Sequence, residues 1–187
     1  MTTHTGTYAL GPDSATLTVR TGKRGAAAMA GHNLQITVSS WSARFELAED
    51  PAASKLSLTA DSRSLKVIAG AGGAQALGGD DKLSIQQSID DDVLKGGPIS
   101  FESTMIHSAA AHGGAEEDLH VHGDLNLLGH TGPLEFTLQI DGAGHLTGGA
   151  TVVQTKFGIK PFSILFGTLK VADEVEVSID GMLPAPG

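Results

Sequence analysis

Alternation of apolar and polar residues runs through most of the chain and constrains its fold more than any other feature. Ala15, Leu17 and Val19 alternate with polar residues, and the same period of two recurs in many later segments. These segments lie at 34–38, 41–47, 56–60, 99–107, 119–127, 134–140, 150–152 and 175–179. A period of two puts apolar side chains on one face of a β-strand and polar side chains on the other. The pattern therefore predicts an all-β protein whose sheet has one buried face and one wet face.

The phase of this alternation slips by one residue at Ser39-Ser40. Apolar residues occupy even positions from Leu34 to Val38 and odd positions from Trp41 to Leu47. A strand keeps the same face buried through such a slip only by means of a bulge or a sharp bend. The sequence therefore predicts a bulge or bend at Ser39-Ser40.

One segment, DDKLSIQQSIDDDVLKGGP, departs from the strand pattern. Ile85, Ile89 and Val93 are spaced four apart, which places them on one face of a helix. Asp80 or Asp81 can cap the beginning of this helix, and the sequence Gly-Gly-Pro at 96–98 ends it. We therefore predict one short helix around residues 80–95, which packs on the sheet or closes one end of it.

The strands can be arranged as a sandwich or as a barrel closed on itself. Several alternating runs are longer than the usual strand of about five to six residues, which favours the barrel. We predict a single domain over residues 1–187, folded as an up-and-down antiparallel barrel of about eight strands. A barrel of this size is just wide enough to hold one small or elongated ligand.

Composition excludes several classes of function. The formal net charge is −9 and the basic residues are scattered, so we expect no nucleic-acid binding. Cysteine is absent, which excludes disulfides, thiolate catalysis and cysteine-based zinc sites. The first residues, MTTHTGTYAL, lack the features of a secretory signal, and no apolar run is long enough for a transmembrane segment. We expect a soluble cytoplasmic protein, or a periplasmic or other extracytoplasmic one if a signal has been removed.

Several segments, taken in order along the chain, resemble the YceI-like family. FESTMIHS at 101–108 resembles the F-x-S-T strand of that family, and GDLNLLGHTGPLEFTL at 123–138 resembles its G-x-L-T-x-x-G-x-T-x-P hairpin. KFGIKPFS at 156–163 resembles its D-F-G-I element, with Lys156 where many members have aspartate. YALGPDSATLTVRT, ADSRSLKV and DEVEVSIDG fit further strands of the family. The resemblance implies a lipocalin-like barrel with an elongated apolar cavity, which holds a polyisoprenoid tail and keeps any polar head near the mouth.

The apolar rows have two interpretations, a filled core or the lining of a ligand cavity, and the family resemblance favours the cavity. We predict that the following apolar side chains line it: Leu34, Ile36, Trp41, Phe45, Phe101, Met105, Val121, Leu125, Leu134, Phe136, Leu138, Phe157, Phe162, Val175 and Val177. His107 continues the inward phase of the strand at 99–107, and His32 and Asn33 lie where the chain enters a strand. These three residues are candidates for contact with a polar head, although a core histidine and ordinary turn chemistry explain them equally well.

His120 and His122 suggest a competing hypothesis, because they share one face of the strand at 119–128. A metal-dependent enzyme could use them together with Asp124 or His130. That face is opposite the apolar row, so exposed histidine is the simpler interpretation, and we expect neither a metal nor a cofactor. The chain also lacks a G-x-S-x-G nucleophile motif. We therefore predict non-enzymatic binding or carriage of an isoprenoid or fatty lipid, with a homodimer as a further expectation. An empty barrel with a stress-related or assembly role is the remaining alternative.

Overall fold

The computed structural model describes residues 4–109 and 117–187, which form twelve strands, one α-helix and several short helical turns. The strands are β1 (Gly6–Leu10), β2 (Ala15–Arg24), β3 (His32–Val38), β4 (Trp41–Leu47), β5 (Lys55–Ala60), β6 (Leu65–Gly72), β7 (Ile99–Ser108), β8 (Glu117–Leu127), β9 (His130–Ile140), β10 (His145–Val153), β11 (Ser163–Ile164) and β12 (Leu169–Met182). The helix α1 spans Gly79–Ser88 and continues into a π-helical turn, η3, at Ile89–Leu94. Four 3-10 turns complete the chain: η1 (Ala28–Ala30), η2 (Pro51–Ala53), η4 (Gln154–Phe157) and η5 (Leu165–Gly167).

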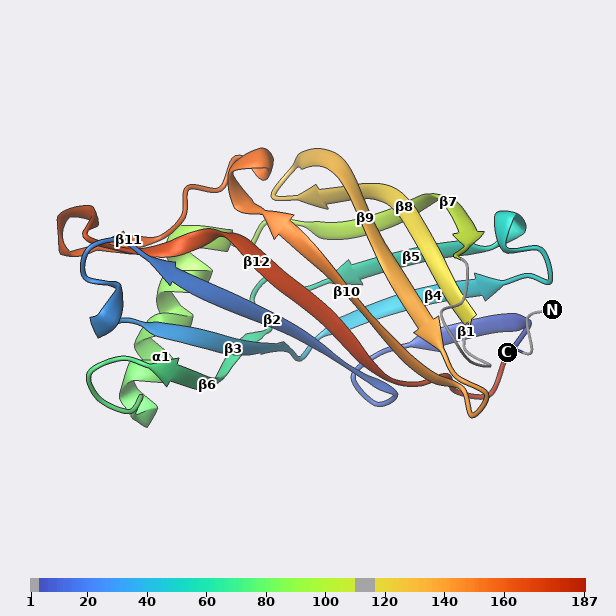
Figure 1. The fold of residues 1–187 in the computed structure, drawn as a ribbon, viewed down its shortest axis with the longest axis horizontal. Coiled ribbons are helices and arrows are strands. Elements are labelled where there is room, and N and C mark those ends of the chain that lie inside the picture. Colours follow the sequence, from blue (N-terminus) through green and yellow to red (C-terminus); the bar gives the residue numbers. More distant parts are fainter. Residues whose placement is uncertain (1–3, 110–116) are drawn as a thin grey trace.

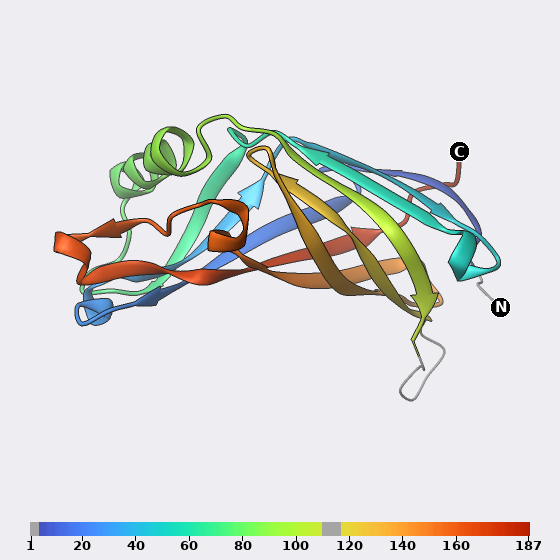
Figure 2. The same ribbon diagram turned by 90° about the horizontal axis from the view of Figure 1, so that it is seen from above.

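A single antiparallel sheet curls round to form the barrel (Figures 1 and 2). Its strands follow the order β1-β4-β5-β7-β8-β9-β10-β12-β2-β3-β6, and β11 pairs with β12. Strands β7 to β10 and β12 are long and extend along most of the barrel wall. Strand β12 pairs with β2 over most of the length of β2. The pairing of β12 with β2 brings the last strand of the chain beside one of the first.

Three pairs of consecutive strands behave as single bent strands, which explains why the sheet has more strands than the alternation predicted. β1 pairs with β4, and their continuations β2 and β3 also pair with each other. In the same way β4 pairs with β5, and their chain neighbours β3 and β6 pair. When β1–β2, β3–β4 and β5–β6 are each counted as one bent strand, eight strands run up and down round the barrel. The predicted all-β antiparallel barrel with one helix is thereby confirmed.

The predicted irregularity at Ser39-Ser40 is the corner between β3 and β4. It lies against a second corner, residues 61–64, between β5 and β6. The Ser39 N–H donates to the Ser64 carbonyl at 2.9 Å, and the Asp61 N–H donates to the Ser40 carbonyl at 3.0 Å. The Ser64 hydroxyl accepts from the Ser40 N–H at 3.1 Å and lies 2.8 Å from the Asp61 carbonyl oxygen. One buried serine thus connects both corners, and this explains how two strands bend together while staying paired.

We expect Ser64→Ala to lower the free energy of unfolding by about 1 kcal/mol, because it removes the part-buried hydrogen bonds that the Ser64 hydroxyl makes with Ser40 and Asp61. Urea denaturation measures this change. Ser42→Ala is the matched control, because the Ser42 hydroxyl is exposed and bonds only to the exposed hydroxyl of Thr59. The control should change stability by less than about 0.5 kcal/mol. Equal effects of the two substitutions would contradict this role of Ser64.

The helix forms where the sequence predicted it. The Asp81 carboxylate accepts from the Gly78 N–H at 2.9 Å at the beginning of the helix. Lys95 and Gly96 end it with positive φ angles of 53° and 68°. Ile85, Ile89 and Val93 are half-buried and pack against the core. Helix α1 lies beside β6 at the end of the barrel far from the chain termini (Figures 1 and 2), and in residues 4–109 and 117–187 no helix is long and apolar enough to span a bilayer.

The two ends of the barrel differ in how they are filled. At the end near the chain termini, side chains with at most 4% exposure fill the interior: Tyr8, Leu47, Ile106, Leu119, Val121 and Ile140. At the opposite end, covered by α1, the interior is hollow. Core packing and a cavity therefore coexist in the same barrel.

Candidate functional site

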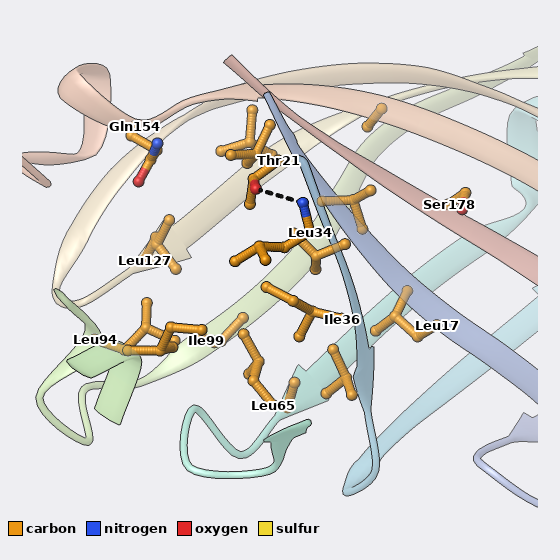
Figure 3. Close-up of a pocket in the computed structure, with 18 of the residues that line it drawn as sticks. Leu17, Thr21, Leu34, Ile36, Leu65, Leu94, Ile99, Leu127, Gln154 and Ser178 are labelled. Carbon is orange, nitrogen blue, oxygen red and sulfur yellow. Dashed lines mark hydrogen bonds between the residues drawn. The ribbon is translucent and has the colours of Figure 1, made fainter. Parts of the chain in front are cut away.

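The hollow end of the barrel holds a cavity of about 660 Å³. Residues from all twelve strands contribute to its wall, and Ile85, Ile89 and Val93 of the helical segment cover one side. Ile164 also lines the cavity while 45% of its surface is exposed, so the cavity reaches the molecular surface beside β11. Figure 3 shows Leu17, Ile36, Leu65, Leu94, Ile99 and Leu127 round this space. The volume lies within the range of about 300–1,000 Å³ that is usual for small-molecule sites.

Polar groups are few on the cavity wall, and the most enclosed of them already have partners. The Thr21 hydroxyl accepts from the Leu34 N–H at 3.2 Å (Figure 3), just beyond the last paired residues of β2 and β3. The Gln154 side-chain amide donates to the Ala172 carbonyl at 2.8 Å. His32 and Lys170 lie closer to the surface. Burial of a polar group without a partner is costly, so such a wall suits an apolar ligand.

Small residues of β10 keep the cavity open. Gly148, Gly149 and Ala150 all lie on its wall. A Cβ atom at Gly148 would lie 2.5 Å from Leu138 Cδ2 and 2.9 Å from the Thr137 carbonyl oxygen, so no side chain fits there without displacing β9. Gly148 thus lets β9 pack closely against β10, whereas the short side chain of Ala150 on the cavity wall leaves space that leucine or phenylalanine would occupy in a filled barrel.

The comparisons with known proteins agree with this geometry. The family model described as "YceI-like domain" matches residues 8–183. The chain belongs to the YceI-like family. A search of curated proteins gives no significant match.

Two solved structures are similar to this YceI-like protein in fold. One is the crystal structure of Burkholderia cenocepacia BcnA, at 18% identity and a TM-score of 0.59, covering 89% of this chain and 94% of the other. The other is a polyisoprenoid binding domain from Saccharophagus degradans implicated in plant cell wall breakdown. It is 11% identical with a TM-score of 0.53, and the match covers 95% of this chain and 99% of the other. At these identities the likeness shows a common fold.

Eleven of the apolar side chains predicted to line a cavity lie on its wall: Leu34, Ile36, Phe45, Phe101, Leu125, Leu134, Phe136, Leu138, Phe162, Val175 and Val177. Trp41, Val121 and Phe157 are buried but lie off the cavity wall, and Phe157, in η4, packs beside Gly132 of β9. Contact of the eleven with a ligand stays a prediction. For these fourteen residues the alternation separated inside from outside, but it carries no signal for which part of the inside is empty.

Met105 and His107 do not face inward as predicted. A bulge in β7 shifts its register against β8, since Ser103 pairs with Gly123 but Met105 pairs with His122. The Ser103 hydroxyl accepts from the Leu56 N–H at 2.8 Å next to this bulge. Beyond it Ile106 takes the buried position, whereas Met105 is 52% exposed and His107 is exposed. Neither Met105 nor His107 can therefore contact a ligand in the cavity.

His32 and Asn33 separate in the structure. His32 lies on the cavity wall near the mouth, and its Nε2 atom is 2.7 Å from the Gln75 carbonyl oxygen. Asn33 is exposed on the outer surface of β3, because neighbouring residues of a strand point to opposite faces. The prediction of a head contact from Asn33 is thereby corrected, and His32 remains a candidate.

The histidines of β8 face outward as predicted, and His107 joins them there because of the bulge. The His107 ring stacks on the His120 and His122 rings, with centroid separations of 5.4 Å and 5.2 Å. His122 Nδ1 lies 3.3 Å from Glu135 Oε1. Within the described parts of the chain, no group of three or more His, Asp or Glu side chains is placed to hold a metal ion.

Sequence reasoning missed the wall residues of β2 and β10. Val19, Thr21 and Ala150 line the cavity, but their small size and mixed polarity did not distinguish them from other strand residues. The signal that was available is the run Gly148-Gly149-Ala150 in the middle of a strand, because glycine inside a strand often marks a close approach of backbone or ligand.

A two-residue substitution test checks the bulge in β7. We expect Ile106→Ala to lower the free energy of unfolding by about 2–5 kcal/mol, because it opens a hole in the packed end of the barrel. Met105→Ala should change it by less than about 0.5 kcal/mol, because the Met105 side chain is exposed. Chemical denaturation of both variants measures the difference. The reverse order of effects is the outcome expected if β7 had no bulge.

A second bulge, in β12, holds the turn η4 beside the cavity. Val171 of β12 pairs with Lys23 of β2, and the next paired residue, Val175, pairs with Thr21. The chain thus advances four residues along β12 but only two along β2. Inside this bulge Asp173 accepts from the Thr155 N–H at 2.8 Å and from the Thr155 hydroxyl at 2.6 Å. Both hydrogen bonds hold the pKa of the Asp173 carboxyl below its ordinary value, and the bond from the Thr155 hydroxyl has the larger effect.

The lowered pKa predicts a dependence of stability on pH. The Asp173 carboxylate stabilises the fold above its unfolded pKa of about 3.9, and this contribution is lost as the pH falls through the lower folded pKa. Asp173→Asn should therefore destabilise the protein near neutral pH, and the difference from the wild type should shrink between about pH 6 and about pH 2. Thermal melts across this range measure it. An NMR titration of Thr155→Val should show the pKa of Asp173 moving part of the way back to its ordinary value, because the Thr155 N–H bond remains.

Proposed function

We propose that this protein binds a long apolar molecule of isoprenoid or fatty-lipid character inside the barrel and acts as a carrier and not as an enzyme. The observation that carries the proposal is the apolar cavity of about 660 Å³, whose enclosed polar groups already have partners. The similar fold of a polyisoprenoid binding domain from Saccharophagus degradans supports the ligand class. Monomer and homodimer are both compatible with this function, and we propose no metal, cofactor or nucleic acid for it.

The size of the cavity limits how much of the ligand is enclosed. If each small group occupies a liquid-like volume of about 30 Å³, the cavity holds about 20 of them. At about 0.8 kcal/mol for each buried methylene, a chain of that length gives a large gross free energy, from which the cost of ordering the chain must be subtracted. Binding therefore needs few polar contacts, and a longer chain or a polar head extends through the mouth beside His32 and Lys170.

Identification of the bound molecule tests this proposal most directly. The protein is purified without detergent and extracted with organic solvent, and the extract is analysed by mass spectrometry beside native mass spectrometry of the intact protein. We expect a long-chain isoprenoid or lipid in about molar equivalence. A protein that yields no apolar molecule and takes up no added polyprenol would instead favour an empty barrel.

A cavity-filling substitution links ligand binding to the cavity. Ala150→Phe puts a ring into the wall of β10, and we expect it to weaken binding of a fluorescent polyprenol probe by at least about tenfold. Such a loss corresponds to the displacement of about two methylene groups. Ala9→Phe is the matched control, because Ala9 is exposed on β1 at the packed end. Thermal melts of both variants confirm folding, and equal probe binding by both would place the site outside the cavity.

A further inference from the structure

We infer that the open end of the barrel docks on the surface of an anionic lipid bilayer. This interaction goes beyond binding of a ligand inside the cavity. Its surface, called the mouth surface below, consists of three segments that border the open end: residues 21–32 with η1, residues 68–85 with the beginning of α1, and residues 160–171 with β11 and η5. In Figures 1 and 2 these segments project together from the end of the barrel opposite the chain termini.

Large apolar side chains are exposed on all three segments. Phe166 in η5 is fully exposed, Met29 in η1 is 87% exposed and Leu83 in α1 is 67% exposed. Ile68 and Ile164 add smaller exposed areas on β6 and β11. Of the seven large apolar side chains exposed in residues 4–109 and 117–187, these five belong to the mouth surface. Exposed apolar residues gathered at one place mark a site of interaction.

Three of these side chains adjoin residues of the cavity wall in the chain or belong to it. Met29 precedes Ala30 and Gly31, which line the cavity, and Leu83 precedes Ser84 and Ile85, which also line it. Ile164 belongs to both surfaces. The exposed apolar side chains and the cavity wall therefore meet at Ile164.

The backbone at Phe166 supports a role for its exposed ring. Phe166 has φ 54° and ψ 32°, a left-handed conformation that is uncommon for an aromatic residue. Gly167, with φ 84°, follows it. The turn thus holds a large apolar ring in solvent by means of a backbone conformation that such residues seldom adopt. Insertion of the ring into a bilayer interface gives it an apolar environment without a change in the turn.

The charge of the mouth surface has the opposite sign to that of the whole chain. Its three segments contain five cationic side chains, Lys23, Arg24, Lys82, Lys160 and Lys170, and two carboxylates, Asp80 and Asp81. The chain as a whole has a formal net charge of −9. Asp90, Asp91 and Asp92 follow in the π-helical turn, on the part of the helix that leads back to β7. Basic residues beside a membrane surface are attracted to anionic lipid head groups, and an otherwise acidic protein is thereby oriented with this end toward them.

The combination of features favours a bilayer over a protein partner or a second copy. The apolar side chains stand on separate projecting segments with cations among them, as in helices and loops that anchor proteins at lipid interfaces. A second copy would bring two cationic surfaces together. The cavity also opens into the same surface, so a ligand could pass between protein and bilayer with little exposure to water. Docking is measurable without any ligand, so it can fail or hold independently of the proposed function.

Flotation with lipid vesicles tests the inference. The full chain is mixed with vesicles of phosphatidylcholine and phosphatidylglycerol, or of phosphatidylcholine alone, and the bound fraction is measured at low and high salt. We expect binding to the anionic vesicles, weakened by salt. The double substitution Phe166→Ser with Leu83→Ser should lower the partition coefficient by at least about tenfold, because two apolar side chains are removed from the interface. Met105→Ser is the matched control, since Met105 is exposed on the outer wall of β7, and it should bind as the wild type does.

Two further measurements separate docking from ligand binding. The double variant should still bind the fluorescent polyprenol probe in solution, and Ala150→Phe should still bind the anionic vesicles. Equal vesicle binding by the wild type and the double variant, or no binding by the wild type, would overturn the inference. A dimer in sedimentation velocity that the double variant loses, without vesicle binding by the wild type, would overturn it in favour of a second copy.

Discussion

The Ser64 hydroxyl and the backbone groups it joins hold two bent strands together, and the shape of the barrel depends on that bend. On one side of the corners β4 pairs with β1 and β5, and on the other side β3 pairs with β2 and β6. A strand without a bend would keep the same direction in the wall along its full length. Three strands turn in this way, and the sheet that they belong to is tightly filled at one end of the barrel and hollow at the other.

Sequence reasoning recovered the architecture because the alternation is a local property. It predicted the all-β barrel, the helix and the irregularity at Ser39-Ser40, since each depends on residues close together in the chain, but it did not predict that three of the eight strands are each divided by a bend. It failed at the bulge in β7 for a physical reason. In the run Ser103 to His107, Met105 and Ile106 are neighbours of similar apolar character, so the sequence fits either phase. Only the pairing with β8, and the hydrogen bond from Leu56 to Ser103, decide which of the two is buried.

The candidate site was predictable in part for the same reason. Inward residues could be recognised one strand at a time, and eleven of the fifteen proposed lining residues lie on the cavity wall. Whether an inward residue meets a neighbour or an empty space depends on the opposite wall. Val121 meets close-packed side chains, whereas Leu125, only four residues further along the same strand, faces the cavity. Which inward positions are filled is therefore visible only when all the strands are assembled.

The filled end of the barrel limits how a ligand can enter and leave the cavity. Since Tyr8, Leu47 and Ile140 fill that end, the cavity is closed there and reaches the surface at the other end, beside Ile164. A chain-like ligand of the proposed kind would therefore enter tail first and leave head first, with its head group at the open end throughout. The depth of the cavity would then set how much of such a ligand is enclosed. A short chain would be enclosed completely, whereas a longer one would leave part of its tail and its head group outside, available for contact with another surface.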